Sequence, residues 1–253
     1  MTDLNKNLIK NTENTEPVRL NKYLSDAGFC SRREADRLIE AGRVSIDGCA
    51  AVMGQKVEKG QKVLVDGKEI KPQEKMILIA FNKPAGVECT SASDNPDNII
   101  DYINYPERIY PIGRLDKPST GLILLTNTGE LVNGILKGSN YHEKEYVVSV
   151  DRQITAQFLE KMRAGVRLDD GVVTRSCSVK QTGKCTFNII LTQGLNRQIR
   201  RMCSALGYEV TSLHRIRVMN IKLGDLPEGK YREVTEPEVR KLIEDIQAGK
   251  KNG

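Results

Sequence analysis

The sequence contains few residues of the kinds that bind metals or form disulfides. It has six cysteines and two histidines, and no two cysteines form a Cys-x-x-Cys pair. Protein zinc sites usually draw their ligands from such closely spaced residues, so we expect no metal site and reduced thiols. No Gly-x-Gly-x-x-Gly motif follows a predicted strand, which argues against a dinucleotide-binding fold. We therefore expect a function that needs neither a metal nor a cofactor.

Long apolar segments are missing as well. No apolar run approaches the roughly 18–20 residues that a helix needs to cross a bilayer. The N-terminus, Met1-Thr-Asp-Leu-Asn-Lys-Asn7, lacks the apolar middle segment of a secretory signal. These absences predict a cytosolic protein with no membrane partner. With 253 residues, of which 39% are hydrophobic and 28% charged, the chain can bury an ordinary core in one or two domains.

Positive charge is present in excess, with a formal net charge of +6, and it is clustered. Arginines gather in two segments, the first with Arg32, Arg33, Arg37 and Arg43 and the second with Arg197, Arg200, Arg201, Arg215 and Arg217. Clustered cations are typical of surfaces that bind phosphate. The clustering favours nucleic-acid binding, and the alternative is a solvated surface whose arginines pair with neighbouring acids.

The segment 18–75 has the pattern of a small α/β module. Apolar residues recur at helical spacing over residues 20–27, and a second helix is predicted to start at Ser31, which forms a Ser-x-x-Glu capping box with Glu34. Residues 1–17 before the module are polar and predict a disordered lead-in. The predicted strands of the module are 44–46, 63–65 and 68–70.

The rest of the chain, residues 76–247, alternates predicted strands with predicted helices. The strand candidates are 77–81, 121–125, 144–150, 187–191 and 216–218. The helix candidates are 128–137, 155–164, 196–206 and 236–246, and a Thr-x-x-Glu capping box of Thr235 and Glu238 opens the last. Hairpin-like neighbouring strands with helices between them indicate an α+β domain with a mostly antiparallel sheet rather than a doubly wound one. Residues 248–253 are predicted to form a flexible tail.

A candidate reactive residue, Asp116, lies in the segment Gly113-Arg-Leu-Asp-Lys-Pro118. An Asp beside Pro and Gly is commonly a turn residue that binds its own backbone, and this is the alternative to a chemical role. Arg114 stands two residues before Asp116, so in an extended segment both side chains would lie on one face. The guanidinium would then keep the carboxylate ionised, and therefore nucleophilic or basic at neutral pH.

The predicted helix 196–206 separates an apolar stripe from an arginine face. The stripe comprises Ile199, Met202, Cys203 and Leu206, and the face comprises Arg197, Arg200 and Arg201. Three arginines so close repel one another and usually have an anionic partner, either phosphate or a carboxylate such as Asp116. A solvated arginine face is the alternative.

Residues 18–70 resemble the RNA-binding module of ribosomal protein S4. The resemblance rests on Lys22-Tyr-Leu-Ser-Asp-Ala-Gly-Phe-Cys-Ser-Arg-Arg-Glu-Ala35 and on Ile39-x-x-Gly-Arg-Val-x-Ile-x-Gly48. It implies that the second helix presents its basic face to RNA phosphates, which gives affinity and register but little sequence discrimination. The residues implied in RNA contact are Lys22, Arg32, Arg33, Arg37 and Arg43.

From Val18 to Ile243 the chain resembles the pseudouridine synthase family that contains the ribosomal small-subunit enzyme A and the large-subunit enzymes B, E and F. The signatures are Asn82-Lys-Pro-Ala-Gly86, Gly113-Arg-Leu-Asp116, Ser119-x-Gly-Leu-x-x-Leu-Thr-Asn127, Lys144-x-Tyr146 and Gln198-Ile-Arg-Arg-Met202. The resemblance implies an isomerase without a cofactor, in which Asp116 is the nucleophile. It also implies that Tyr146 packs against the target base and that Arg200 pairs with Asp116.

The resemblance also implies a substrate. Most members have Glu-Gly-Arg where this chain has Gln193-Gly-Leu195, and the segment is similar to the branch that contains the large-subunit enzyme F. This branch implies 23S ribosomal RNA as the substrate, a tRNA as a second candidate, and a target uridine that is flipped out of its stack. We expect a monomer. The further residues implied in RNA contact are Arg114, Leu115, Lys117, Asn196, Arg197, Gln198, Ile199 and Arg201.

Two other functions are compatible with the residue patterns. A non-catalytic RNA-binding or ribosome-assembly protein would need only the basic clusters. A metal-dependent nuclease would need clustered carboxylates, for which Asp169-Asp170 is the candidate, although these residues stand before Gly171 and read as a turn.

Overall fold

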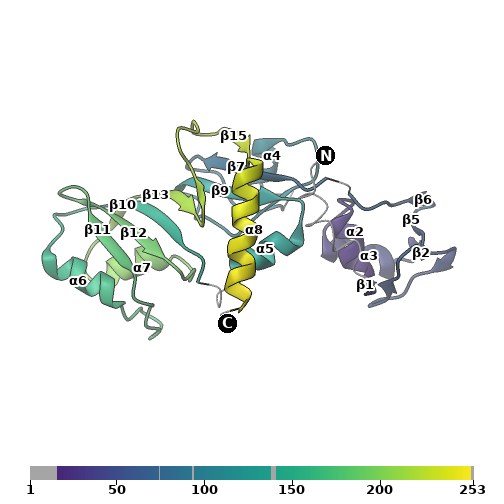
Figure 1. The fold of residues 1–253 in the computed structure, drawn as a ribbon, viewed down its shortest axis with the longest axis horizontal. Coiled ribbons are helices and arrows are strands. Elements are labelled where there is room, and N and C mark those ends of the chain that lie inside the picture. The colour runs from purple at the N-terminus through teal and green to yellow at the C-terminus, as the bar shows by residue number, and fades with distance from the viewer. Residues whose placement is uncertain (1–15, 74, 93, 138–140, 252–253) are drawn as a thin grey trace. The chain divides into compact units, whose positions relative to one another are not determined.

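The computed structural model describes residues 16–251 except residues 74, 93 and 138–140. The chain divides into two compact units, an N-terminal module and a larger unit (Figure 1). Most of the predicted lead-in, residues 1–15, lies outside the described residues. The module comprises Met1–Ile77, Tyr105–Ile109 and Asn127–Gly129, and the larger unit comprises Leu78–Asn104, Tyr110–Thr126 and Glu130–Gly253.

Two helices and short strands make up the N-terminal module. The Ser31 hydroxyl accepts a hydrogen bond from the Glu34 amide (3.1 Å), so the second helix starts where the capping box predicted. The apolar faces of the helices pack against the strands and form a core that includes Leu24, Leu38 and Val63. The elements are β1 (Val18–Arg19), α2 (Leu20–Asp26), α3 (Arg32–Glu40), β2 (Val44–Ile46), β3 (Cys49–Ala50), β4 (Lys56–Val57), β5 (Val63–Val65) and β6 (Lys68–Glu69).

A nine-stranded sheet is the centre of the described part of the larger unit. Its order is β11-β12-β10-β13-β9-β7-β15, with β14 beside β13 and β8 beside β9. Among these described strands, every pair is antiparallel except β9 and β13, so the predicted mostly antiparallel α+β fold is confirmed. The strands are β7 (Leu78–Lys83), β8 (Tyr110–Pro111), β9 (Thr120–Thr126), β10 (Lys144–Val150), β11 (Ser178–Gln181), β12 (Thr186–Leu191), β13 (Val210–Val218), β14 (Ile221–Lys222) and β15 (Tyr231–Glu233).

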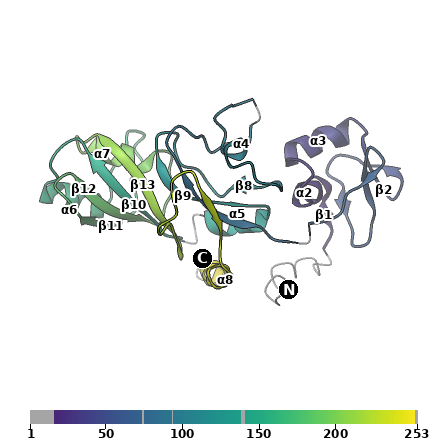
Figure 2. The ribbon, with the colours of Figure 1, turned by 90° about the horizontal axis from the view of Figure 1, so that it is seen from above.

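Helices pack on this sheet and on one another. Those described in the larger unit are α4 (Ile99–Ile103), α5 (Gly129–Leu136), α6 (Ala156–Ala164), α7 (Gln198–Ala205) and α8 (Glu236–Lys251). α6 and α7 share a core with β10 to β13, in which Phe158 and Met202 are fully or almost fully buried. α5 and α8 lie side by side in Figures 1 and 2, and a Cβ on Gly134 would come within 2.8 Å of Ile246. Glycine in α5 therefore permits the close packing of α8.

The C-terminus of the structure differs from the sequence-based prediction. Residues 248–253 are predicted to be flexible, but α8 continues to Lys251, while residues 252 and 253 lie outside the described residues. The polar residues that end α8 include good helix formers, so the helix persists without apolar residues to mark it. The prediction also omits α4, β11 and β15, which are too short to show a clear periodicity.

The parallel strands β9 and β13 approach closely at Gly121. A Cβ on Gly121 would lie 2.3 Å from the carbonyl oxygen of Arg215 and 2.7 Å from its amide nitrogen. Gly121 also has φ of +98°, a conformation that residues with a Cβ rarely adopt. Glycine is therefore required where the loop that carries Asp116 enters the sheet.

We predict that Gly121→Ala lowers the free energy of unfolding by about 3 kcal/mol or more, because it adds a backbone clash to a strained φ. Gly171→Ala is the matched control, since Gly171 has φ of +83° but nothing lies within 4 Å of its Cβ position. Gly171→Ala should lower the free energy of unfolding by only about 1 kcal/mol. Urea unfolding followed by circular dichroism measures both values. Equal losses in the two variants would contradict the close approach of β9 and β13.

The start of α8 is fixed by Glu238. Its carboxylate accepts hydrogen bonds from the amide and the hydroxyl of Thr235 (2.9 Å each), and the bond from the amide is one of the two bonds of a capping box. It also accepts two hydrogen bonds from Arg232 (2.8 Å each). The hydrogen bonds from Arg232 are the largest cause that lowers the pKa of Glu238 to about 2.

Because the folded-state pKa of Glu238 lies below its ordinary value of 4.5, this carboxylate stabilises the fold above that pH and loses its contribution as the pH falls toward 2. We predict that Glu238→Gln lowers the free energy of unfolding by about 2 kcal/mol at pH 7 and by much less at about pH 2.5. Glu236→Gln, which removes an exposed pair with Arg240, is the control and should change little. If Glu238→Gln lowers the free energy of unfolding by the same amount at both pH values, the lowered pKa of Glu238 is refuted.

Candidate active site

Asp116 lies in the loop between β8 and β9. Its carbonyl oxygen accepts a hydrogen bond from the Ser119 amide (2.9 Å), so the backbone of Asp116 does open a turn. The carboxylate, however, lies 3.6 Å from the guanidinium of Arg200 on α7. The side chain of Asp116 is 28% exposed, so it combines a charged partner with access from outside.

Arg200 on α7 is held by contacts on both sides of its guanidinium. Nη1 donates to the carbonyl oxygen of Val210 and Nη2 donates to the hydroxyl of Ser119, each at 3.2 Å. Nε faces the Oδ2 of Asp116 at 3.6 Å and has no hydrogen-bond acceptor among the described residues. Because Ser119 is fully buried, the loop and the helix are joined at a fixed point beside the carboxylate.

The predicted pairing of Asp116 with Arg114 is wrong. Arg114 is exposed, and the described ion pair of Asp116 is with Arg200. The prediction relied on the spacing of two residues, but the carboxylate of Asp116 faces Arg200 on α7 instead. The arginine helix therefore supplies the partner, as the resemblance implies.

Lys83, which ends β7, fixes the loop on one side of Asp116. It is fully buried, and its ammonium donates to the carbonyl oxygens of Pro84 (2.8 Å), Val87 (2.7 Å) and Lys117 (3.2 Å). Burial lowers the pKa of Lys83, and the nearby charge of Asp116 partly opposes this shift. This lysine stands in one of the family signatures, but no role was predicted for it. Its place at the end of an apolar strand is the signal that could have marked it as buried.

Cys89 fixes the loop on the other side of Asp116. Its sulfur accepts a hydrogen bond from the amide of Leu115 (3.3 Å). The thiol is buried, and burial raises its pKa. The residues directly before and after Asp116 are thus both anchored through their backbones.

Tyr146 lies on β10 next to β13, in register with Arg215 of that strand. Its half-buried ring packs against the core formed with α6 and α7. The Cζ atom of Arg215 lies 6.0 Å from the centre of the ring. In the sheet order, the single strand β13 lies between β10, which carries Tyr146, and β9, which follows Asp116.

In the larger unit, two of the cations implied in RNA contact are paired with carboxylates. The ammonium of Lys117 lies 2.7 Å from Asp97, and both side chains are half exposed. Arg201 forms ion pairs with Asp169 and Asp170. The carboxylates considered for a nuclease are therefore engaged by an arginine.

The other residues implied in RNA contact in this unit differ in exposure. Asn196 and Arg197 are exposed just before α7. Leu115, Gln198 and Ile199 are only 7%, 5% and 4% exposed. These three side chains pack inside the protein, where they hold the loop and the helix in place.

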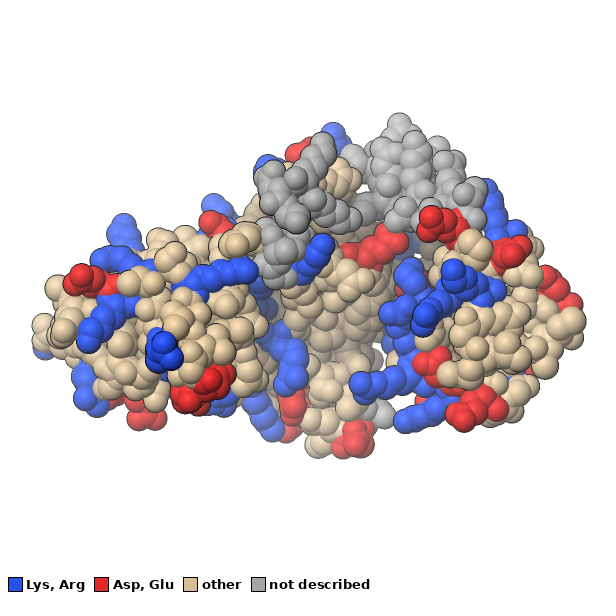
Figure 3. All heavy atoms as spheres, turned by 90° about the horizontal axis from the view of Figure 1, so that it is seen from below, with Lys and Arg blue, Asp and Glu red and all other residues tan. Residues whose placement is uncertain are grey.

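The basic residues of the N-terminal module lie at its surface, and Figure 3 shows Lys and Arg side chains gathered there. Arg32, Arg33, Arg37 and Arg43 are exposed, while Lys22 is half-buried. Three of the five have carboxylate partners: Lys22 pairs with Asp26, Arg37 with Glu34 and Arg43 with Asp66. Exposed pairs of this kind contribute little stability, so RNA phosphates can compete for these cations.

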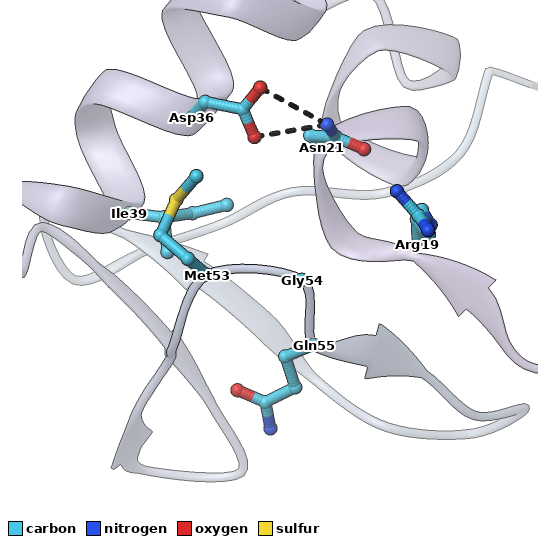
Figure 4. A pocket seen from close by; sticks show the side chains of 7 residues that line it. All are labelled: Arg19, Asn21, Asp36, Ile39, Met53, Gly54 and Gln55. Atoms are coloured by element: carbon cyan, nitrogen blue, oxygen red, sulfur yellow. Dashed lines mark hydrogen bonds between the residues drawn. The ribbon is translucent and has the colours of Figure 1, made fainter.

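A small hollow in the module contains none of the residues implied in RNA contact. Figure 4 shows the amide of Asn21 turned toward Asp36, and it donates to both carboxylate oxygens (2.9 and 3.2 Å). The hollow is lined by Arg19, Asn21, Asp36, Ile39, Met53, Gly54 and Gln55.

Metal-binding and membrane-spanning features can be checked over the described part of the chain. There, no three His, Cys, Asp or Glu side chains lie close enough together to hold a metal ion. In the same described residues, no helix is both long enough and apolar enough to cross a membrane.

Comparison with known proteins places these features in a family. Residues 77–205 match the family model for RNA pseudouridylate synthase, and residues 18–49 match the S4 domain. The chain is similar to the dual-specificity RNA pseudouridine synthase RluF of Salmonella typhi, with 52% identity over 91% of this chain and 80% of that protein. It is likewise similar to RluF of Escherichia coli (strain K12), with 51% identity over the same shares of both chains.

More distant relatives are also pseudouridine synthases. The ribosomal large subunit pseudouridine synthase B of Bacillus subtilis (strain 168) is 34% identical over 88% of this chain and 95% of that protein. A crystal structure of a pseudouridylate synthase superposes with a TM-score of 0.66 and 27% identity, covering 89% of this chain and 99% of the other. These similarities favour a catalytic protein over a non-catalytic RNA-binding protein. The chain belongs to the RNA pseudouridylate synthase family, with an S4 domain before the catalytic domain.

Proposed function

We propose that this pseudouridine synthase uses Asp116 as its nucleophile and acts on uridines in 23S ribosomal RNA and in a tRNA. The ion pair between Asp116 and Arg200 is the observation that carries the catalytic part of the proposal. It puts a partly exposed carboxylate beside a guanidinium that other contacts hold in place. A carboxylate so positioned can attack without first losing a proton to another base.

The reaction has simple requirements. The bond from the sugar C1′ to the uracil N1 breaks, the base turns, and a bond forms from C1′ to the uracil C5. The proton on C5 is lost and N1 gains one, so the product is an isomer and no electrons enter or leave. Asp116 can serve by attack on the sugar, by attack on the uracil ring, or by removal of a sugar proton to give a glycal.

The roles proposed for the neighbouring residues follow from their positions. Arg200 keeps a positive charge beside Asp116 and holds the loop through Ser119. Tyr146 offers a half-buried ring against which a flipped base can stack. Flipping the base costs a few kcal/mol, which contacts with RNA phosphates offset. Exposed residues suited to such contacts are Arg114, Asn196 and Arg197.

The substrate proposal rests on similarity. The relatives with 51–52% identity are named dual-specificity enzymes, and the segment Gln193-Gly-Leu-Asn-Arg197 is similar to that branch. We assign RNA binding to the S4 domain at residues 18–75 and chemistry to residues 76–247. The enzyme is proposed to act as a monomer in the cytosol.

We predict that Asp116→Asn folds and binds RNA but forms no pseudouridine, because the amide cannot act as the nucleophile. The measurement is a map of pseudouridines in ribosomal and transfer RNA from cells that lack the protein and express either the wild type or the variant. Asp225→Asn, which changes an exposed aspartate of the same unit, is the control and should restore every site. Product formed by Asp116→Asn would refute the role of Asp116. Sites confined to one RNA class would refute dual specificity.

We predict that the double substitution Arg32→Ala with Arg33→Ala weakens RNA binding equally for all sequences, because phosphate contacts carry no sequence information. The slope of log K against log salt should fall by roughly 0.7–0.9 for each phosphate that the variant no longer neutralises. Binding is measured with the full chain in an Asp116→Asn background, so that no turnover occurs. Arg152→Ala, an exposed arginine of the larger unit paired with Asp151, should leave the slope unchanged. An unchanged slope in the double variant would argue against RNA contact by α3.

A further inference from the structure

Arg215 on β13 is a buried cation whose donors are only partly used. The residue is 3% exposed, and its Nε donates to the carbonyl oxygen of Leu122 (2.6 Å). Its Nη2 is buried and has no hydrogen-bond partner among the described residues. A guanidinium carries five N–H donors, and a buried donor without an acceptor costs free energy. Such a group in a folded protein calls for an explanation.

The surroundings of Arg215 increase the cost of its charge. It lies beside Tyr146 of β10, and Lys144 precedes Tyr146 by two residues on the same face of that strand. Burial and the charge of Arg215 together lower the pKa of Lys144 to about 8. Among the described ion pairs, neither cation has a carboxylate partner. Two cations are thus placed in one buried region without an anion to neutralise them.

A purely structural role accounts for part of this arrangement. The bond from Nε to Leu122 links the side chain on β13 to the neighbouring strand β9, and a structural arginine needs nothing more. It does not account for Nη2, which remains unpaired next to the ring proposed to stack on the target base. A partner that arrives with the substrate accounts for both the free donor and the excess of positive charge.

We infer that Arg215 is a further catalytic residue, whose free N–H group donates to a carbonyl oxygen of the flipped uracil. The inference rests on the proposed stacking of the target base on Tyr146. When the bond between C1′ and N1 breaks with its electron pair left on the base, negative charge spreads over the two carbonyl oxygens of uracil. A guanidinium donor stabilises this charge until C5 bonds to C1′, C5 loses its proton and N1 takes one up. The same donor favours binding of the uracil before reaction.

The test compares two RNAs that differ only at the target nucleotide, one with uridine and one with an abasic site. Binding is measured in an Asp116→Asn background with and without Arg215→Met, which removes the donors and keeps an apolar chain of similar length. We expect Arg215→Met to weaken binding of the uridine RNA roughly 10-fold or more and binding of the abasic RNA much less. Equal weakening for both RNAs would overturn the inference, because a structural defect does not distinguish them.

Turnover gives a second readout. With Asp116 intact, Arg215→Met should lower kcat by about 100-fold, and Arg215→Lys, which keeps a charge and a donor, should restore part of the loss. If Arg215→Met does not fold, the two-RNA comparison is made with Arg215→Lys, and equal effects on both RNAs again overturn the inference. Arg232→Met is the control, because Arg232 is engaged by Glu238 and should affect thermal stability without changing kcat. Absence of product from the wild type would instead count against the proposed function.

Discussion

The ion pair between Asp116 and Arg200 is the contact on which the arrangement of the site depends, because it joins a loop before β9 to a helix before β13. Neither segment could hold the pair alone. The loop is anchored at its backbone by the buried ammonium of Lys83 and by the thiol of Cys89. The helix side is anchored when Arg200 binds the carbonyl oxygen of Val210. The carboxylate is therefore preorganised, which is how a protein places a reactive group without reorganising it during the reaction.

The sheet explains why these segments meet. β9 and β13 run parallel in a sheet that is otherwise antiparallel among the described strands, so the loop before one lies beside the helix before the other. Gly121 permits the strands to approach. The resulting region contains Lys83, Lys144 and Arg215 as buried or largely buried cations. Such an excess of positive charge suits a polyanionic substrate such as RNA.

The sequence predicted the main helices and strands because their periodicity is strong. It did not predict features that depend on contacts between distant segments of the chain. The helix starts marked by Ser31 and Thr235 and the apolar stripe of α7 are local patterns, and each is found where the sequence predicts it. The pairing of Asp116 could not be derived from spacing, since its partner Arg200 lies on a helix far along the chain. Family resemblance supplied Arg200 instead. Burial of Gln198 and engagement of Arg201 by a distant acidic pair are likewise tertiary effects that no short pattern contains.

The central claim is that this site exchanges the N1 of uridine for its C5 at the sugar. The most direct measurement uses ribosomal RNA and tRNA that carry tritium at C5 of uridine, taken from cells without the protein and incubated with the purified enzyme. Bond formation at C5 must release that hydrogen, so the account predicts tritium in the solvent, in amounts that saturate at a small whole number per RNA molecule. RNA that is bound by the enzyme but releases no tritium would contradict the account.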